Sequence, residues 1–200
     1  TLMNAISWYD SRAFEEAARI RSDFDNFLVF SRTGRQISSL VFPEVMWLKK
    51  HRPQIYEKTY KFLMGLDFLL YRFCGNAATD YTMASGTLCY DTSNRDWIPE
   101  FFNNYDIDMG KFPQIHCFGD VVGTVVPKVA EQLGLSTNTK VVAGLQDQKA
   151  AAIGAGINSE IITISLGTAS AISSIASKHI VDQNMSAACH GFDRQGWILE

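Results

Sequence analysis

Residues 141–174 constrain the fold of this 200-residue chain more than any other stretch, because they place an acid and a glycine-threonine turn at the ends of two strands. Val141 and Val142 are β-branched, and the alanine-rich run 148–157 favours helix. Asp147 is therefore expected where a strand gives way to a helix. A carboxylate there can cap the helix, or it can face the crevice at the carboxyl ends of the strands, where α/β proteins bind ligands. The local pattern leaves both interpretations open.

Residues 161–175 predict a β-hairpin with a small polar tip. Ile161–Leu166 is typical of a buried strand, Gly167 and Thr168 of a tight turn, and 169–175 of a returning strand. Glycine lets the backbone approach an anion closely, and exposed N–H groups with a threonine hydroxyl can donate to phosphate oxygens. An ordinary hairpin turn is the alternative, since glycine is the default turn residue. The pairing with Asp147 is what supports a phosphate-binding tip.

Helical and strand patterns alternate along the rest of the chain. We expect helices at 11–30, 43–50, 66–74, 97–104 and 127–133, and strands that end near Ile6, Val126, Val142 and Leu166. Gly75 and Gly134 follow two of these helices and are expected as their C-caps. With 46% hydrophobic residues, the chain can bury a sizeable core in one or two domains. The alternation predicts an α/β fold.

Charge and cysteine content exclude several kinds of partner. Eighteen basic and 21 acidic residues give a net charge of −3, so no global positive field would recruit nucleic acid or an anionic membrane. The most apolar segment, 62–73, contains Gly65, Asp67 and Arg72 and is too short to span a bilayer. The four cysteines form no C-x-x-C pair and no zinc-type spacing with histidine, which predicts reduced thiols, a cytoplasmic location and no metal bound by protein side chains.

Several motifs in sequence order resemble one enzyme family. The runs G-L-Q-D-Q at 144–148 and I-S-L-G-T-A-S at 164–170 resemble the centre of the FGGY carbohydrate kinases. The segment W-Y-D-S-R at 8–12 is similar to the family's W-x-D-x-R. Residues 43–50 resemble a further signature around Trp47, although Glu44 stands where the family usually has lysine. The resemblance extends over essentially the whole chain and is closest to xylulokinase-like members.

The resemblance implies an actin-like (ribonuclease H-like) fold with two lobes. Residues 1–156 would form the later part of the N-terminal sugar-binding lobe, and residues 157–200 the first strands of the C-terminal nucleotide-binding lobe, with the boundary near Gly156 to Glu160. The D-x-G-T-type motif that opens the family is not found, and the family's adenine-binding glycines lie further along. We therefore expect these residues to be an internal portion of a longer kinase.

The resemblance also implies a reaction, the ATP-dependent phosphorylation of a sugar or polyol hydroxyl. Asp147 would be the general base, while Gly167 and Thr168 would contact nucleotide phosphates bridged by Mg²⁺. Gln148 would hydrogen-bond substrate hydroxyls, or it is an exposed glutamine in the first turn of a helix.

A second substrate-side group is predicted near the N-terminal end of the chain. In a strand, Trp8, Asp10 and Arg12 would share one face and could point into the same cleft. The alternative is a core tryptophan beside a surface Asp–Arg pair.

Substrate choice stays open within the family. A ketopentose such as xylulose is the first expectation, with gluconate, glycerol or a deoxyketose as alternatives. A non-catalytic sugar-binding module is the alternative from a different functional class, and a homodimer is left open.

Overall fold

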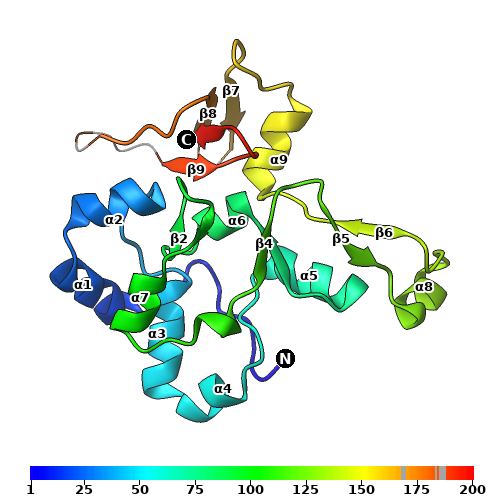
Figure 1. Ribbon diagram of the computed structural model, residues 1–200, viewed down its shortest axis with the longest axis horizontal. Helices are drawn as coiled ribbons and strands as arrows, with labels where there is room; N and C mark the ends of the chain where they lie inside the picture. Colours follow the sequence, from blue (N-terminus) through cyan, green and yellow to red (C-terminus); the bar gives the residue numbers. More distant parts are fainter. Residues whose placement is uncertain (168–169, 183, 185–187) are drawn as a thin grey trace.

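The computed structural model describes residues 1–167, 170–182, 184 and 188–200 (Figure 1). Its helices are α1 Phe14–Asp23, α2 Asn26–Thr33, α3 Phe42–His51, α4 Pro53–Lys58, α5 Gly65–Cys74, α6 Tyr81–Ser85, α7 Pro99–Asn104, α8 Pro127–Leu133 and α9 Asp147–Gly154, with a 3-10 turn η1 at Met109–Lys111. Its strands are β1 Ala78–Asp80, β2 Tyr90–Asp91, β3 Asp96–Trp97, β4 Gln114–His116, β5 Val121–Thr124, β6 Lys140–Val142, β7 Thr163–Leu166, β8 Ser170–Ala176, β9 Cys189–Gly191 and β10 Trp197–Leu199.

The first helices and α7 surround a core rich in aromatic rings. Phe42, on α3, is fully buried, and its ring centroid lies 5.2 Å from that of Phe102 on α7. Phe102 in turn packs edge-on against Phe112 at 4.9 Å. Edge-to-face packing at these distances is a favoured arrangement of aromatic pairs. This core holds together α1, α2, α3, α4 and α7, which lie on one side of the molecule in Figure 1.

The helix predicted over residues 11–30 is wrong in one respect, because the structure divides it into α1 and α2. Phe24 adopts an extended backbone, with φ −128° and ψ 149°, and its ring turns towards Phe101 at 4.8 Å. The Asp25 carboxylate then caps α2 by accepting the Leu28 N–H at 2.8 Å. Burial of an aromatic ring and a strong N-cap residue together outweigh the helical periodicity.

The predicted helix at 97–104 begins two residues late. Trp97 pairs with Tyr90 as part of the β2–β3 ladder, and α7 starts at Pro99, whose ring suits the first helical turn. The helix ends expected from glycine are confirmed, since Gly75 and Gly134 both adopt the left-handed conformation as C-caps of α5 and α8.

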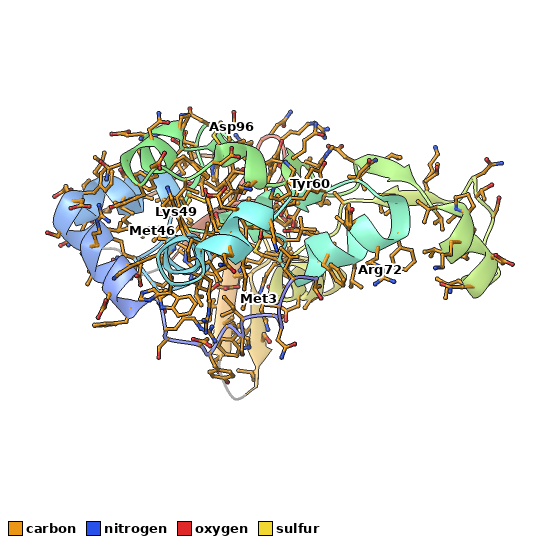
Figure 2. The ribbon with its side chains drawn as sticks, turned by 90° about the horizontal axis from the view of Figure 1, so that it is seen from below. Met3, Met46, Lys49, Tyr60, Arg72 and Asp96 are labelled. Atoms are coloured by element: carbon orange, nitrogen blue, oxygen red, sulfur yellow. The ribbon has the colours of Figure 1, made fainter. Side chains whose placement is uncertain are left out.

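Besides the β2–β3 ladder, the middle of the described chain forms two more small ladders. β1 pairs with β4 in parallel, and β5 pairs with β6 in antiparallel register. Figures 1 and 2 both show the unit of β5, β6 and α8 projecting from one end of the molecule beyond α5. A second apolar cluster, which includes Leu70, Val122 and Val141, joins this unit to α5.

The last part of the described chain forms a four-stranded sheet with the order β7-β8-β10-β9. The predicted hairpin is confirmed by the antiparallel register of β7 and β8, in which Leu166 pairs with Ser170. The burial predicted for the first strand is wrong, because Ile164 and Leu166 are exposed. Helix α9 lies against this sheet through a third cluster of Ala152, Ile157, Phe192 and Ile198. Thr168, at the predicted tip, lies outside the described residues.

Two further sequence expectations concern cysteines and membranes. Cys74, Cys89, Cys117 and Cys189 are all free thiols, as predicted. Within the described residues, no helix has the length and apolar character needed to cross a bilayer.

Candidate functional site

Asp147 occupies the first turn of α9, directly after the segment that leaves β6. The structure makes Gln146 the N-cap instead of Asp147, and the Gln146 side-chain oxygen accepts the N–H groups of Gln148 at 3.2 Å and Lys149 at 3.4 Å. The Asp147 carboxylate also accepts the Gln148 N–H, at 2.7 Å. The helix cap predicted at Asp147 is therefore formed one residue earlier, by Gln146. A glutamine side chain is long enough to extend to the first N–H groups of the helix that follows it. Asp147 itself is exposed.

A chain of hydrogen bonds fixes the turn that carries Asp147. The Gln146 N–H donates to the Thr82 hydroxyl at 2.9 Å, and that hydroxyl donates to the Asp80 carboxylate at 2.6 Å. Asp80 is buried and also accepts the Thr82 N–H at 2.7 Å. Burial raises the pKa of Asp80, and the donors from Thr82 oppose that rise. The segment that leads from β6 to Asp147 is thus anchored to the junction of β1 and α6.

Gly144 lets the segment between β6 and α9 pass close to α5. A Cβ atom at Gly144 would come within 3.2 Å of a Leu66 methyl group, tighter than an ordinary contact. Gln148, the residue after Asp147, is half-buried. The predicted pair of Asp147 and Gln148 therefore starts a helix whose position is set by neighbours on two sides.

Residues 8–12 do not form the expected strand. The Asp10 N–H donates to the Ser7 carbonyl at 2.8 Å, which closes a turn at Trp8 and Tyr9. The Asp10 carboxylate then accepts both the Arg12 N–H at 2.9 Å and the Arg12 guanidinium at 2.6 Å. Aspartate favours this local hydrogen bonding over an extended backbone. The three side chains consequently do not share a strand face.

The alternative of a core tryptophan is not found at this position either. Trp8 is 70% exposed and stacks on Tyr9, with ring centroids 3.7 Å apart. The Asp10–Arg12 pair is present as an ion pair, and its guanidinium lies 4.9 Å from the centre of the Trp47 ring. Hydrogen bonds from Arg12 lower the pKa of Asp10 to about 2.

Glu44 is close enough to the Asp10–Arg12 ion pair to interact with both charges. In the sequence this residue stands out only because it occupies a position where the family usually has lysine. Its carboxylate accepts the Val41 N–H at 3.2 Å and so caps α3, next to a Val41 held at the unusual φ of 55°. Burial first, and the charge of Asp10 in addition, raise the pKa of Glu44 to about 7. A carboxyl that titrates near neutrality beside a predicted substrate residue is a candidate functional group that periodicity alone does not reveal.

Only part of the predicted phosphate-binding turn lies within the described residues. Gly167 is exposed directly after β7, while Thr168 lies outside the described residues. Among the described residues, no hydrogen bond or ion pair links Asp147 to Trp8, Asp10 or Arg12.

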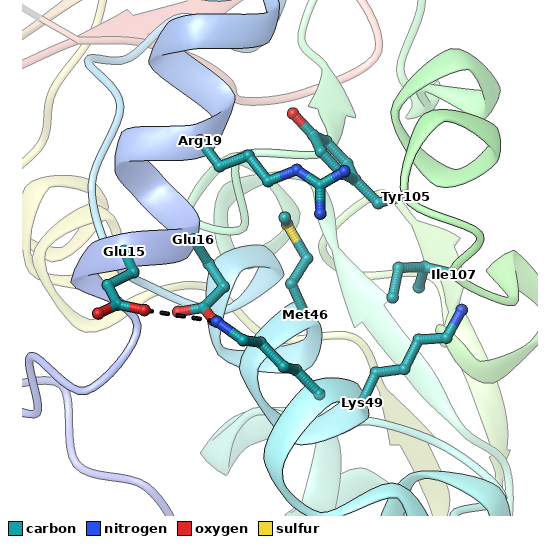
Figure 3. Close-up of a pocket in the computed structure, with 8 residues that line it drawn as sticks. Glu15, Glu16, Arg19, Met46, Lys49, Tyr105 and Ile107 are labelled. Atoms are coloured by element: carbon teal, nitrogen blue, oxygen red, sulfur yellow. Dashed lines mark hydrogen bonds and ion pairs between the residues drawn. The ribbon is translucent and has the colours of Figure 1, made fainter.

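No cluster of three or more His, Cys, Asp or Glu side chains suited to a metal ion occurs in the described part of the chain. A cavity of about 370 Å³ lies elsewhere, between α1, α3 and the segment after α7 (Figure 3). It is lined by charged and apolar side chains, including Glu16, Arg19, Met46, Lys49 and Tyr105, and none of the predicted site residues borders it. The candidate site is therefore the open surface around Asp147.

Comparison with known proteins gives a consistent result. Residues 1–154 match the model of the N-terminal domain of the FGGY family of carbohydrate kinases. The chain is 34% identical over 172 residues to a xylulose kinase of Bacillus subtilis (strain 168), which covers 86% of this chain and 34% of that protein. It is 30% identical to a xylulose kinase of Escherichia coli (strain K12), over 99% of this chain and 41% of that protein. The chain thus spans little more than a third of these curated relatives.

Solved structures agree on the fold. A ligand-bound xylulose kinase from Lactobacillus acidophilus superposes with a TM-score of 0.89 at 24% identity, covering 99% of this chain and 41% of that one. A Plasmodium falciparum glycerol kinase with ADP gives a TM-score of 0.87 at 22% identity, again over 99% of this chain and 41% of that one. These similarities confirm the predicted α/β class and the actin-like sugar-kinase fold.

Proposed function

We propose, on the premise that this chain belongs to the FGGY family of carbohydrate kinases, that the complete protein transfers the γ-phosphoryl group of ATP to a hydroxyl group of a sugar or polyol. The observation that carries the proposal is the position of Asp147, an exposed carboxylate in the first turn of α9. Hydrogen bonds from Gln146 through Thr82 to the buried Asp80 hold the preceding turn in place. A positioned carboxylate that faces solvent can meet a substrate hydroxyl.

In the proposed reaction, Asp147 acts as the general base. Its carboxylate accepts the proton of the attacked hydroxyl, the hydroxyl oxygen forms a bond to the γ-phosphorus, and the bond from that phosphorus to the β,γ-bridging oxygen breaks to release ADP. A positioned base typically contributes 10²- to 10⁴-fold to such a rate. Most of the remaining acceleration in phosphoryl transfer comes from positioning and electrostatic stabilisation.

Sugar kinases of this family use ATP and typically Mg²⁺, and we assign the phosphate side of the site to Gly167 and Thr168. Gly167 is exposed at the end of β7, where the absence of a side chain permits close approach of an anion. Mg²⁺ is usually held by one or two carboxylates together with substrate phosphates.

Gln148, Trp8, Asp10 and Arg12 are proposed for the sugar side. Gln148 follows the base directly and is half-buried, so its amide can hydrogen-bond a substrate hydroxyl next to the reacting one. Trp8 is exposed and offers a flat apolar surface for a sugar ring. Asp10 and Arg12 form an ion pair in which hydrogen bonds from Arg12 lower the pKa of Asp10 to about 2, and together they present acceptors and donors.

A ketopentose such as xylulose is the proposed substrate, since several of the similar curated proteins are named xylulose kinase. Gluconate, glycerol and a deoxyketose are the alternatives. We further propose the division into a sugar-binding lobe at 1–156 and the first strands of a nucleotide-binding lobe at 157–200, as well as a cytoplasmic location in keeping with four free thiols.

The test is Asp147→Asn in the complete protein, assayed for ATP-dependent phosphorylation of D-xylulose, gluconate and glycerol. We expect turnover to fall by roughly 10²- to 10⁴-fold while sugar binding, measured by thermal shift, is retained. Asp96→Asn is the matched control, because Asp96 is also exposed but lies on β3. Retained turnover in Asp147→Asn would refute the assignment of the base. A wild-type protein that binds sugar but phosphorylates none of the three would instead favour a non-catalytic sugar-binding module.

A further inference from the structure

Lys149 is almost completely buried although it lies only two residues after the exposed Asp147. Its exposed fraction is 1%, and it shares the buried face of α9 with Ala152, three residues further on. Residues two apart on a helix point roughly 200° apart around its axis. Burial of Lys149 on one side of α9 therefore places the Asp147 side chain on the opposite side of the helix.

The partner of Lys149 comes from the C-terminal sheet. The Lys149 ammonium lies 2.7 Å from the Glu200 carboxylate, and the second Glu200 oxygen accepts a hydrogen bond from Ser173 on β8 at 3.4 Å. The Glu200 backbone is also fixed, since its N–H and C=O both pair with Ala188, at 3.0 and 2.7 Å. A lysine is rarely buried unless it is paired. This pairing therefore joins α9 to a well-anchored point of the sheet.

The surroundings of the pair are positively charged. Arg35 follows the C-cap of α2, and burial lowers its pKa while Glu200 opposes that change. His190, on β9, is buried, and its pKa is held well below the ordinary value by burial and then by the charges of Lys149 and Arg35. Glu200 thus offsets the charges of the buried Lys149 and the half-buried Arg35, with a smaller contribution of Asp147 to Lys149, so loss of the Glu200 charge removes the main compensation of both cations.

The backbone at this place is closely packed as well. The Cys189 N–H donates to the Gly34 carbonyl at 2.7 Å, and a Cβ atom at Gly34 would lie 1.8 Å from the Cys189 oxygen. The sheet that carries Glu200 is consequently docked against the end of α2, and it has little freedom to follow α9 if the ion pair is lost.

We propose that the Lys149–Glu200 ion pair is a positioning device for the phosphoryl transfer proposed above, on which this inference rests. It sets the rotation of α9 against the C-terminal sheet and so directs the Asp147 carboxylate towards the substrate. Lys149 does not touch the reacting atoms; it acts through the helix.

A double-mutant cycle in the complete protein tests this role. The variants are Lys149→Met, Glu200→Gln and the combination of both, with kcat measured at saturating sugar and ATP well below the melting temperature. We expect each single variant to lose roughly 10- to 100-fold in kcat, because a displacement of the order of 1 Å can cost that much. The KM for ATP should change little. The double variant should lose no more than the larger single loss, because both changes remove the same interaction.

Ala152→Gly is the matched control, since Ala152 lies on the same buried face and its replacement loosens α9 without changing charge. We expect this variant to lower the melting temperature with nearly unchanged kcat. Three results would overturn the proposal: wild-type kcat in either single variant, additive losses in the double variant, or an equal kcat loss in Ala152→Gly. If Lys149→Met does not fold, Glu200→Gln, which keeps the shape of the side chain, decides alone. Activity retained in Asp147→Asn would instead overturn the proposed function.

Discussion

The aromatic core around Phe42 and the β7–β8 hairpin place apolar side chains in opposite environments. Phe42, Phe101 and Phe102 have exposed fractions of 1% or less. On the hairpin, Ile164 and Ile172 are paired across the strands and are 57% and 59% exposed, and Leu166 is 82% exposed. The core is held by burial of large rings, whereas the hairpin is held by its backbone ladder and the preference of β-branched residues for strands.

This difference shows that the same residue types carry different information in the two regions. In the core, apolar residues pack against one another, and truncation of one side chain is expected to destabilise the whole fold. On the hairpin, apolar residues lie on an exposed face and contribute little to packing. Only the first region should therefore respond strongly to truncation of a side chain.

The largest effect is expected from Phe102→Ala. Phe102 contacts the rings of Phe42, Trp97 and Phe112, and removal of a buried phenylalanine costs about 3–5 kcal/mol of unfolding free energy. Urea denaturation followed by tryptophan fluorescence measures this, because Trp97 lies 6.4 Å from the Phe102 ring. A loss below about 1 kcal/mol would show that the core repacks and that the contrast with the hairpin is smaller than described.

A medium effect, dependent on pH, is expected from Asp67→Asn on α5. Asp67 is fully buried on α5, where it accepts the Met64 N–H at 3.0 Å, and burial raises its pKa to about 7 from an ordinary 3.8. Between these values the folded chain keeps the proton and the unfolded chain releases it. The wild type should therefore lose stability as pH rises from about 4 to about 7 and lose no more above that range.

Asparagine cannot ionise, so Asp67→Asn should remove this contribution to the pH dependence. We expect the variant to be more stable than the wild type by about 1–3 kcal/mol at pH 8, relative to the difference between them at pH 4. Denaturation curves at both pH values supply the measurement. An unchanged pH dependence in the variant would assign the titration to another group, for which Glu44 is the first candidate because its pKa is also raised to about 7.

The smallest effect is expected from Ile172→Thr on the hairpin. Threonine is β-branched and keeps the strand preference, while the exposed position of Ile172 means that little apolar burial is lost. The unfolding free energy should stay within about 0.5 kcal/mol of the wild type. A destabilisation as large as that of Phe102→Ala would show that the hairpin face is packed in solution and would remove the contrast between the two regions.

Local patterns predicted the parts of the fold that depend on neighbouring residues. Gly75 and Gly134 end their helices because glycine adopts the left-handed conformation without strain, and Gly167 follows a strand as the pattern indicated. The patterns failed where distant groups or local side-chain hydrogen bonds competed. Phe24 interrupts a helix to reach Phe101, and Asp10 closes a turn where a strand was expected.

The candidate site shows the same division. The position of Asp147 at the start of a helix followed from valines before it and alanines after it. The burial of Lys149, the role of Glu44 as a cap and the identity of Gln146 as the true N-cap carried no clear local signal. Charged residues are usually exposed, so a buried lysine can be identified only once its partner is known.

The order of residues alone determined the family, the position of the acid before α9 and the hairpin after it, because these depend on motifs and on backbone preferences over a few residues. Only the tertiary structure decided which face of α9 is buried and where Asp147 points. That decision depends on Lys149 meeting Glu200, a contact between residues far apart in the chain. Short-range preferences select a helix, whereas its rotation is selected by the distant charges and apolar groups that it must satisfy.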